Sequence, residues 1–137
     1  MKIVLDTNVW LSGLFWSGEA SKIIELGEKQ RITILVSEEL ILEFADVLQR
    51  ETKFTRLLES KEENIREVIK TMLSISTIIT PKTKLNIIKD DPDDTKILEL
   101  AFDGKAKYIV SYDKHLLSLK EFHKIQILHP KKFLAGF

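Results

Sequence analysis

Four acidic residues spread along the chain are the side chains best suited to chemistry: Asp6, Glu43, Asp94 and Asp113. The chain has no Cys and no His-x-x-x-His pair, so its strongest candidate ligands are carboxylate oxygens. Oxygen ligands of this kind favour Mg²⁺ or Mn²⁺ over zinc. Such an ion can polarise a phosphoryl oxygen and lower the pKa of a bound water. The residue types therefore predict hydrolysis of a phosphodiester bond, provided that folding brings the acids together.

Other catalytic arrangements find little support in the sequence. The histidines are scattered, at His115, His123 and His129, and are expected to be surface or loop residues. No Ser stands in a G-x-S-x-G setting or a recognisable triad. A receiver-like phosphate switch would carry paired acids early in the chain, and a dehalogenase-like phosphatase would carry D-x-D, whereas this chain has Asp6 in a D-T-N segment. Both alternatives are therefore disfavoured.

The elements that must position the acids alternate between strand and helix. Short apolar or β-branched runs predict strands at 3–5, 32–36, 76–80, 108–110 and 125–128. Helical patterns fill the gaps, at 20–29, from a Ser37 cap to about Arg50, from a capping box at 60–63, and from Asp91-Pro92 to Gly104. This order predicts a three-layer α/β/α sandwich with a central parallel sheet of about five strands, in a single domain that spans 1–137.

Two of the acids follow predicted strands. Asp6 comes directly after the first strand, and Asp113 stands three residues after Val110, the last residue of the fourth. Because parallel strands share one polarity, both acids are expected at the same edge of the sheet, where ligands bind in open α/β folds.

The other two acids lie on predicted helices. Glu43 stands at the boundary of the apolar face of the helix that begins after Ser37. Asp94 projects close to the centre of the apolar face of its helix, which is costly unless the carboxylate is paired, hydrogen-bonded or metal-bound. An alternative for Asp94 is capping of free backbone N–H groups in the first helical turn. Asp91, at the cap position, is a candidate fifth acid.

Charge and composition narrow the partners and the compartment. The chain has 21 basic and 21 acidic residues, so any binding of nucleic acid must depend on local patches or on a site. No apolar stretch approaches the roughly 20 residues needed to span a bilayer, and the start does not resemble a signal peptide. The absence of Cys permits an intracellular location, and a cytoplasmic protein is expected.

Four segments of the chain together resemble one known family. IVLDTNVW, SEELILEFADVL, DPDDTKILELA and KYIVSYDKHLL occur in the order and spacing of PIN domains, and they look most like the VapC-like branch of toxin components from toxin–antitoxin systems. The resemblance spans essentially the whole chain. It implies a PIN-like fold, an endoribonuclease activity that depends on Mg²⁺ or Mn²⁺, an RNA substrate and an antitoxin partner, and it favours a homodimer.

The resemblance also assigns roles to individual residues. It makes Asp6, Glu43, Asp94 and Asp113 the four acids of the site in chain order. It implies that Asn8 orients Asp6 or a metal-bound water. Ser111 occupies the position of a small hydroxyl residue that would support the site as a hydrogen-bond donor.

Two features leave alternatives open. Tyr112 stands where many relatives have a small residue such as Gly, so it could narrow the cleft or offer a base a stacking surface. The segment 9–16 could contact a partner or a second copy, although its large side chains Trp10, Leu11, Leu14 and Phe15 are expected more often in the core. The competing functions are an RNA-processing nuclease without an antitoxin, and a non-catalytic binding module on the same fold.

Overall fold

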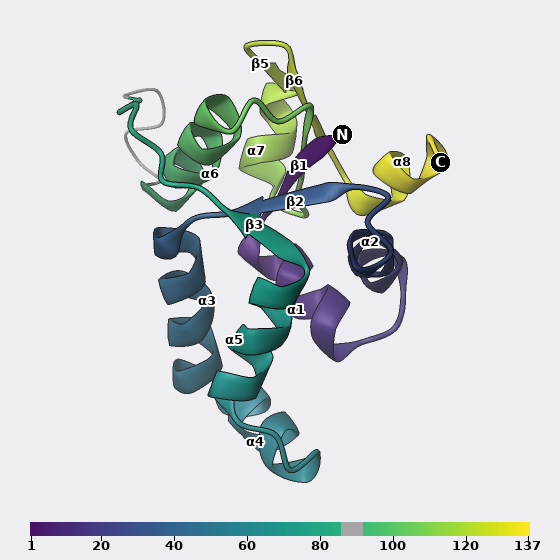
Figure 1. The fold of residues 1–137 in the computed structure, drawn as a ribbon, viewed down its shortest axis with the longest axis vertical. Helices are drawn as coiled ribbons and strands as arrows, with labels where there is room; N and C mark the ends of the chain where they lie inside the picture. The colour runs from purple at the N-terminus through teal and green to yellow at the C-terminus, as the bar shows by residue number, and fades with distance from the viewer. Residues whose placement is uncertain (86–91) are drawn as a thin grey trace.

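A computed structural model describes residues 1–85 and 92–137 of the chain (Figure 1). The strands are β1 (Lys2–Leu5), β2 (Thr33–Val36), β3 (Ser76–Ile78), β4 (Tyr108–Val110), β5 (Glu121–Phe122) and β6 (Ile125–Leu128). The helices are α1 (Thr7–Phe15), α2 (Glu19–Glu28), α3 (Glu38–Arg50), α4 (Thr52–Ser60), α5 (Ile65–Ser74), α6 (Pro92–Asp103), α7 (Lys114–Leu119) and α8 (Pro130–Ala135).

The strands form one mixed sheet in the order β3-β2-β1-β4-β6-β5. The five strands predicted from the sequence are all present and pair in parallel. The two-residue strand β5, which was not predicted, pairs antiparallel with β6 at the edge of the sheet. The predicted α/β class and its parallel sheet are therefore confirmed.

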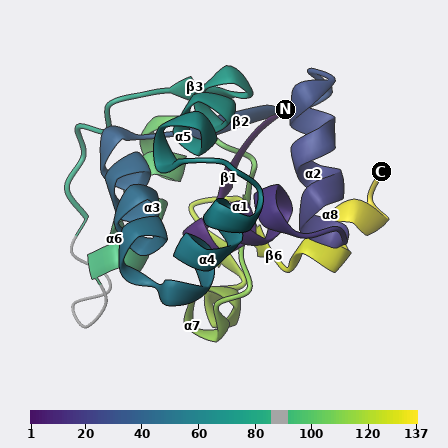
Figure 2. The same cartoon turned by 90° about the horizontal axis from the view of Figure 1, so that it is seen from below.

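Helices cover both faces of the sheet, as the alternation of elements predicts. In Figure 1, α6 and α7 lie on one side of the strands, and α1, α2, α3 and α5 lie on the other. The view from below in Figure 2 shows α3, α4 and α1 grouped together, with α2 beside α8. Both pairs of neighbours, α3 with α4 and α2 with α8, are in contact. None of the described helices combines the length and apolar character that crossing a membrane requires.

The core is centred on β1, whose Ile3, Val4 and Leu5 have no exposed surface. A strand with no polar alternation is expected to be covered on both faces, and here helices of both layers cover it.

On α1, Trp10 and Phe15 are buried, whereas Trp16 just after the helix is 48% exposed. The core alternative for the segment 9–16 is therefore correct for Trp10, Leu11 and Phe15, whereas Leu14 is only half-buried.

Of two helix starts predicted from capping residues, one is confirmed and the other is wrong. Ser37 caps α3, because its hydroxyl accepts a hydrogen bond from Leu40 N at 3.1 Å. The box predicted at 60–63 is wrong, because Ser60 ends α4 and donates its hydroxyl to Leu57 O. The true cap of α5 is Asn64, whose side chain accepts from Glu67 N at 3.0 Å. An N-x-x-E pattern four residues further along carries the signal.

The helix α6 ends where predicted, at Asp103 just before Gly104. Two acids on its last turns hold the preceding segment of the chain, residues 82–85. The Asp103 carboxylate accepts hydrogen bonds from Lys82 N, Thr83 N and the Thr83 hydroxyl. One turn earlier, Glu99 accepts from Leu85 N at 2.9 Å. This clamp, defined by Asp103 and Glu99, fixes the chain immediately before the residues that lead into α6.

Candidate active site

The first strand ends directly in a candidate acid. Asp6 follows Leu5 of β1, and its backbone N–H donates to Val110 O at the end of β4 over 3.0 Å. Its extended backbone makes it the N-cap of α1, and its Oδ1 accepts from Thr7 N at 2.7 Å. The N-terminus of a helix favours a negative charge, so this position suits a carboxylate.

A buried hydroxyl joins the acids of the two central strands. Ser111, which is completely buried, donates its hydroxyl to Asp6 Oδ2 at 2.8 Å. The same hydroxyl oxygen accepts from Asp113 N at 2.9 Å. Ser111 therefore fixes Asp6 and the backbone of Asp113 relative to one another. The structure brings these three predicted site residues together at the carboxyl edge of the sheet.

Asp113 repeats the arrangement of Asp6 on the neighbouring strand. It caps α7, and its Oδ1 accepts from His115 N at 2.7 Å and from Leu116 N at 3.4 Å. Both bonds fall on Oδ1, so no described residue hydrogen-bonds the other carboxylate oxygen. Asp113 thus combines a structural role at a helix terminus with an oxygen available for a ligand.

Asp94 lies where the helical wheel places it, on the core-facing side of α6. It is 4% exposed, and Ile97 and Leu98, on the same apolar face, are also buried. The helix packs against β1, β2 and β4, the central strands of the sheet. A carboxylate in this environment needs compensation of its charge, and a bound cation is one form of it.

Glu43 occupies the boundary position predicted for it on α3. It is half-buried, next to the fully buried Phe44. The helix starts at the end of β2, so it begins at the same sheet edge as Asp6. One turn before Glu43, Glu39 pairs with Lys96 of α6 at 3.7 Å, so the two helices that carry Glu43 and Asp94 are in contact.

Other predicted residues stand apart from this group or outside the described chain. Asn8 is exposed in the first turn of α1, and no described residue hydrogen-bonds its side chain. Its predicted role toward Asp6 therefore stays a prediction. Asp91 lies outside the described residues.

The donor set of the site is made of carboxylate and hydroxyl oxygens, which fits a hard divalent cation such as Mg²⁺ or Mn²⁺. Within residues 1–85 and 92–137, no three Asp, Glu or His side chains form a group that could hold a metal ion as they stand. The structure thus shows a linked pair of acids, Asp6 and Asp113, and a buried acid, Asp94. That all four acids bind the same metal site stays a prediction.

A further residue at this edge is His129, which the sequence predicts to be a surface or loop residue and which lies between β6 and α8. His129 follows β6 as Asp6 follows β1, and the preceding Leu128 O accepts from Ser111 N at 3.0 Å. Its ring contacts Tyr112, with the ring centroids 5.1 Å apart. The rule that placed Asp6 and Asp113 at the sheet edge also applies to His129, because 125–128 was correctly predicted as a strand.

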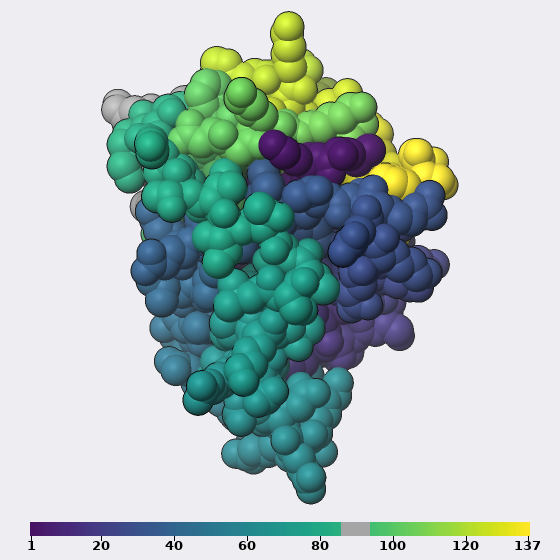
Figure 3. Space-filling view, viewed as in Figure 1, coloured from purple at the N-terminus to yellow at the C-terminus, as the bar shows by residue number. Residues whose placement is uncertain are grey.

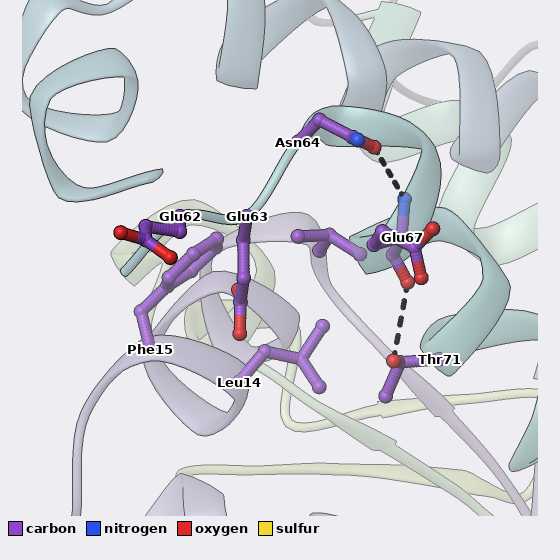
Figure 4. A pocket seen from close by; sticks show the side chains of 8 residues that line it. Leu14, Phe15, Glu62, Glu63, Asn64, Glu67 and Thr71 are labelled. Carbon is purple, nitrogen blue, oxygen red and sulfur yellow. Dashed lines mark hydrogen bonds between the residues drawn. The ribbon is translucent and has the colours of Figure 1, made fainter. Parts of the chain in front are cut away.

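A separate pocket of about 550 Å³ lies between α1 and the start of α5, and contains none of the four acids (Figure 4). Its apolar side chains belong to both helices, and its rim carries three glutamates. We call it the acidic pocket; its lining residues are Leu14, Phe15, Val68, Glu62, Glu63, Glu67, Asn64 and Thr71.

Comparison with known proteins identifies the family. A model of the PIN domain family matches residues 2–115. The uncharacterized protein MJ1680 of Methanocaldococcus jannaschii is 31% identical over 148 aligned positions, which cover 100% of this chain and 92% of that protein. The crystal structure of VapBC2 from Rickettsia felis, bound to a DNA fragment from the VapBC2 promoter, contains a chain with the same fold. It matches with a TM-score of 0.63 at 16% identity, over 93% of this chain and 97% of that chain. Because the family model matches most of the chain, this protein belongs to the PIN domain family.

Proposed function

We propose that this protein is a metal-dependent endoribonuclease that hydrolyses RNA phosphodiester bonds and acts in the cytoplasm as the toxin of a toxin–antitoxin pair. PIN domains are generally nucleases, which are hydrolases, and the family generally uses divalent metal ions. The observation that carries the proposal is the link from Asp6 through Ser111 to Asp113 at the carboxyl edge of the sheet.

Asp6, Glu43, Asp94 and Asp113 are the residues proposed to hold Mg²⁺ or Mn²⁺, with Asp91 as a further candidate. When bound, such an ion polarises a phosphoryl oxygen and lowers the pKa of a water.

The chain's own contribution is to fix these oxygens before substrate arrives. Ser111 donates to Asp6 Oδ2, so the carboxylate is held in one orientation. The N–H groups at the start of α7 hold Asp113 in the same way, through its Oδ1. A site whose donors are oriented in advance needs less reorganisation when the reaction occurs.

The proposed activity can be tested directly with purified protein. We expect cleavage of single-stranded or structured RNA when Mg²⁺ or Mn²⁺ is present, and its loss when EDTA removes the metal. The double variant Asp6→Asn, Asp94→Asn keeps the shape of both side chains and is expected to lose cleavage while circular dichroism stays unchanged. If the double variant cleaves RNA as fast as the unmodified protein, the proposed site is wrong.

The toxin assignment requires an antitoxin, and the structural neighbour is a chain of a toxin–antitoxin complex. The acidic pocket supports such a partner, because its apolar side chains and glutamate rim complement a segment with apolar and basic residues. We expect a small protein encoded beside this one to co-purify with it. Glu67→Lys is expected to weaken that complex, whereas Glu28→Lys, the same change on the exposed face of α2, is the matched control. Equal co-purification of both variants would remove the acidic pocket from the proposal.

We further propose that residues 1–137 act as one domain and that the protein forms a homodimer. Light scattering at several protein concentrations tests the dimer, and a mass of one chain throughout would refute it. Limited proteolysis tests the single domain, which should resist cleavage into two stable fragments.

A further inference from the structure

The carboxyl end of β6 extends the candidate active site on the side away from β1. Ser111 N donates to Leu128 O at 3.0 Å, so the end of β6 is attached directly to the residue that links Asp6 and Asp113. Beyond the end of β4, Tyr112 follows Ser111, and beyond the end of β6, His129 follows Leu128. Tyr112 and His129 therefore lie at the sheet edge that carries Asp6 and Asp113.

The rings of Tyr112 and His129 form an aromatic pair. Their centroids are 5.1 Å apart and their planes meet at 81°, an edge-to-face contact. Both residues are half-buried, so each retains surface that a ligand can contact. The hydrogen bonds of Ser111 and Asp113 on either side fix the backbone of Tyr112.

The orientation of the histidine ring is also fixed. His129 caps α8, and its Nδ1 accepts from Lys131 N at 3.1 Å. In the neutral ring, an Nδ1 that accepts a hydrogen bond leaves the proton on Nε2, which makes Nε2–H a donor. The aromatic pair therefore offers ring surface together with a polar edge.

His129 also lines a cleft of about 600 Å³ between the end of α7, β6 and α8. Two lysines, Lys120 and Lys132, line this cleft against a single acid, Glu121, and Gln126 adds an amide. The neighbouring turn between β5 and β6 projects at the top of the space-filling view in Figure 3. The cleft thus combines an excess of positive charge with the ring of His129, which contacts Tyr112.

We propose that Tyr112 and His129 form a nucleotide-binding subsite for single-stranded RNA on the β6 side of the acids. A base stacks on the aromatic pair, and an adjacent phosphate lies against Lys120 and Lys132 in the cleft. Sequence-tolerant binding of single strands combines stacking on aromatic rings with basic grooves that follow the backbone. The inference deepens the proposed function and rests on it, because it names where the RNA would bind beside the cleavage site.

Binding can be measured apart from cleavage. The full-length protein is titrated against a short fluorescein-labelled single-stranded RNA of mixed sequence in EDTA, and fluorescence anisotropy gives Kd. Removal of a stacking ring is expected to weaken binding roughly 5- to 150-fold. Tyr112→Ala should show this loss, and Tyr112→Phe, which keeps the ring, should recover most of it.

Two further variants keep the test decisive if Tyr112→Ala does not fold. His129→Asn removes the ring but retains a side-chain oxygen that can cap α8, and it should also weaken binding.

The double variant Lys120→Gln, Lys132→Gln should weaken binding and reduce its dependence on salt. The matched control is Lys61→Gln, Lys70→Gln, which removes the same charge from exposed positions at the end of α4 and on α5. Equal Kd values for the cleft variant and this control would overturn the phosphate contact.

Cleavage assays with Mn²⁺ separate the subsite from the proposed function. For Tyr112→Ala the larger effect is expected on KM rather than kcat, because the ring positions substrate without joining the acids. If the unmodified protein cleaves RNA but Tyr112→Ala and His129→Asn leave Kd and KM unchanged, the subsite is wrong and the nuclease stands. If the protein binds RNA through these residues but never cleaves it, the subsite stands and the nuclease is wrong. If the variants lose only a protein partner, the RNA subsite is overturned.

Discussion

At the scale of single residues, Ser111 connects two candidate acids that come from different strands. Its hydroxyl donates to Asp6 and accepts from the backbone of Asp113, and it has no exposed surface. A buried hydroxyl with two partners cannot be removed without leaving those partners unsatisfied.

We therefore predict that Ser111→Ala lowers the free energy of unfolding by about 1–3 kcal/mol and also reduces RNA cleavage. Urea unfolding and initial cleavage rates measure the two effects. Ser111→Thr keeps the hydroxyl and is the control, which should retain more activity than the Ala variant. An Ala variant as stable and active as the unmodified protein would contradict the role given to this hydroxyl.

The two roles of Asp113 can be separated by choosing the substitution. Asp113→Asn keeps an oxygen that can accept from His115 N and Leu116 N, whereas Asp113→Ala removes the cap of α7. We expect Ala to be about 1 kcal/mol less stable than Asn, and both variants to lose cleavage because both lose the carboxylate. Thermal unfolding and RNA cleavage are the measurements. If Asn retained full cleavage, Asp113 would be a capping residue alone.

At the scale of elements, the Asp103 half of the clamp makes the attachment of residues 82 and 83 to α6 depend on pH. Hydrogen bonds from the Thr83 hydroxyl and backbone hold the pKa of Asp103 below its ordinary value of 3.8. Because the pKa is lower in the folded state, the carboxylate form stabilises the fold. This contribution is fully present above pH 3.8 and is lost as the pH falls through the lowered value.

We predict that Asp103→Asn is less stable than the unmodified protein near neutral pH, and that the difference shrinks as the pH falls below 3.8. Urea unfolding at a series of pH values from neutral to acid measures this difference. A constant difference over the whole range would show that the charge of Asp103 does not contribute to the clamp.

Just beyond α6, Gly104 is required by close packing rather than by an unusual backbone angle. A Cβ atom at this position would overlap the side chains of Leu35 and Ile79 and approach Leu100 O to 2.9 Å. We predict that Gly104→Ala costs about 1–3 kcal/mol of stability. Gly136→Ala is the matched control, because its Cβ would meet only Phe133 O at 3.6 Å. Equal unfolding midpoints for the two variants would show that close packing does not require a glycine at position 104.

The elements also show how far the sequence predicts the fold. The strand β1 and the cap at Ser37 could be predicted from the sequence, because the local residue pattern at each agrees with the burial and hydrogen bonding in the fold. The helix α1 was not assigned, because Val9, Trp10 and Leu11 are all buried and consecutive buried residues leave no amphipathic face to recognise. The strand β5 has only two residues, which is too short for any periodicity.

The site was partly predictable for a similar reason. Strand ends placed Asp6 and Asp113 at one edge, and the helical wheel placed Asp94 toward the core. The contact between Tyr112 and His129 depends on which strands are neighbours, and the order β1-β4-β6 is not contained in any local pattern. Residues far apart in the chain that meet through sheet order are therefore the part that sequence reasoning missed.

At the scale of the whole molecule, the balance of 21 basic and 21 acidic residues limits how the proposed RNA substrate can be held. Without an overall positive field, binding must depend on few phosphate contacts, such as those proposed for Lys120 and Lys132. For single strands, the logarithm of the binding constant falls with the logarithm of salt with a slope of about −0.7 per neutralised phosphate. We predict a slope of about −1.4 from these two lysines. A slope several times steeper would show that a broader basic surface takes part.

The bond between Ser111 and Asp6 joins residues 105 positions apart in the chain. Because β1 lies between β2 and β4, its second neighbour in the sheet is made late in synthesis. At about 5–20 residues per second, a nascent chain waits roughly 5 to 20 seconds between the appearance of Asp6 and that of Ser111. During that interval the nascent chain has Asp6 but neither Ser111 nor Asp113, so the candidate site cannot form. For the proposed ribonuclease, the order of the strands postpones activity until Ser111 and Asp113 have been synthesised.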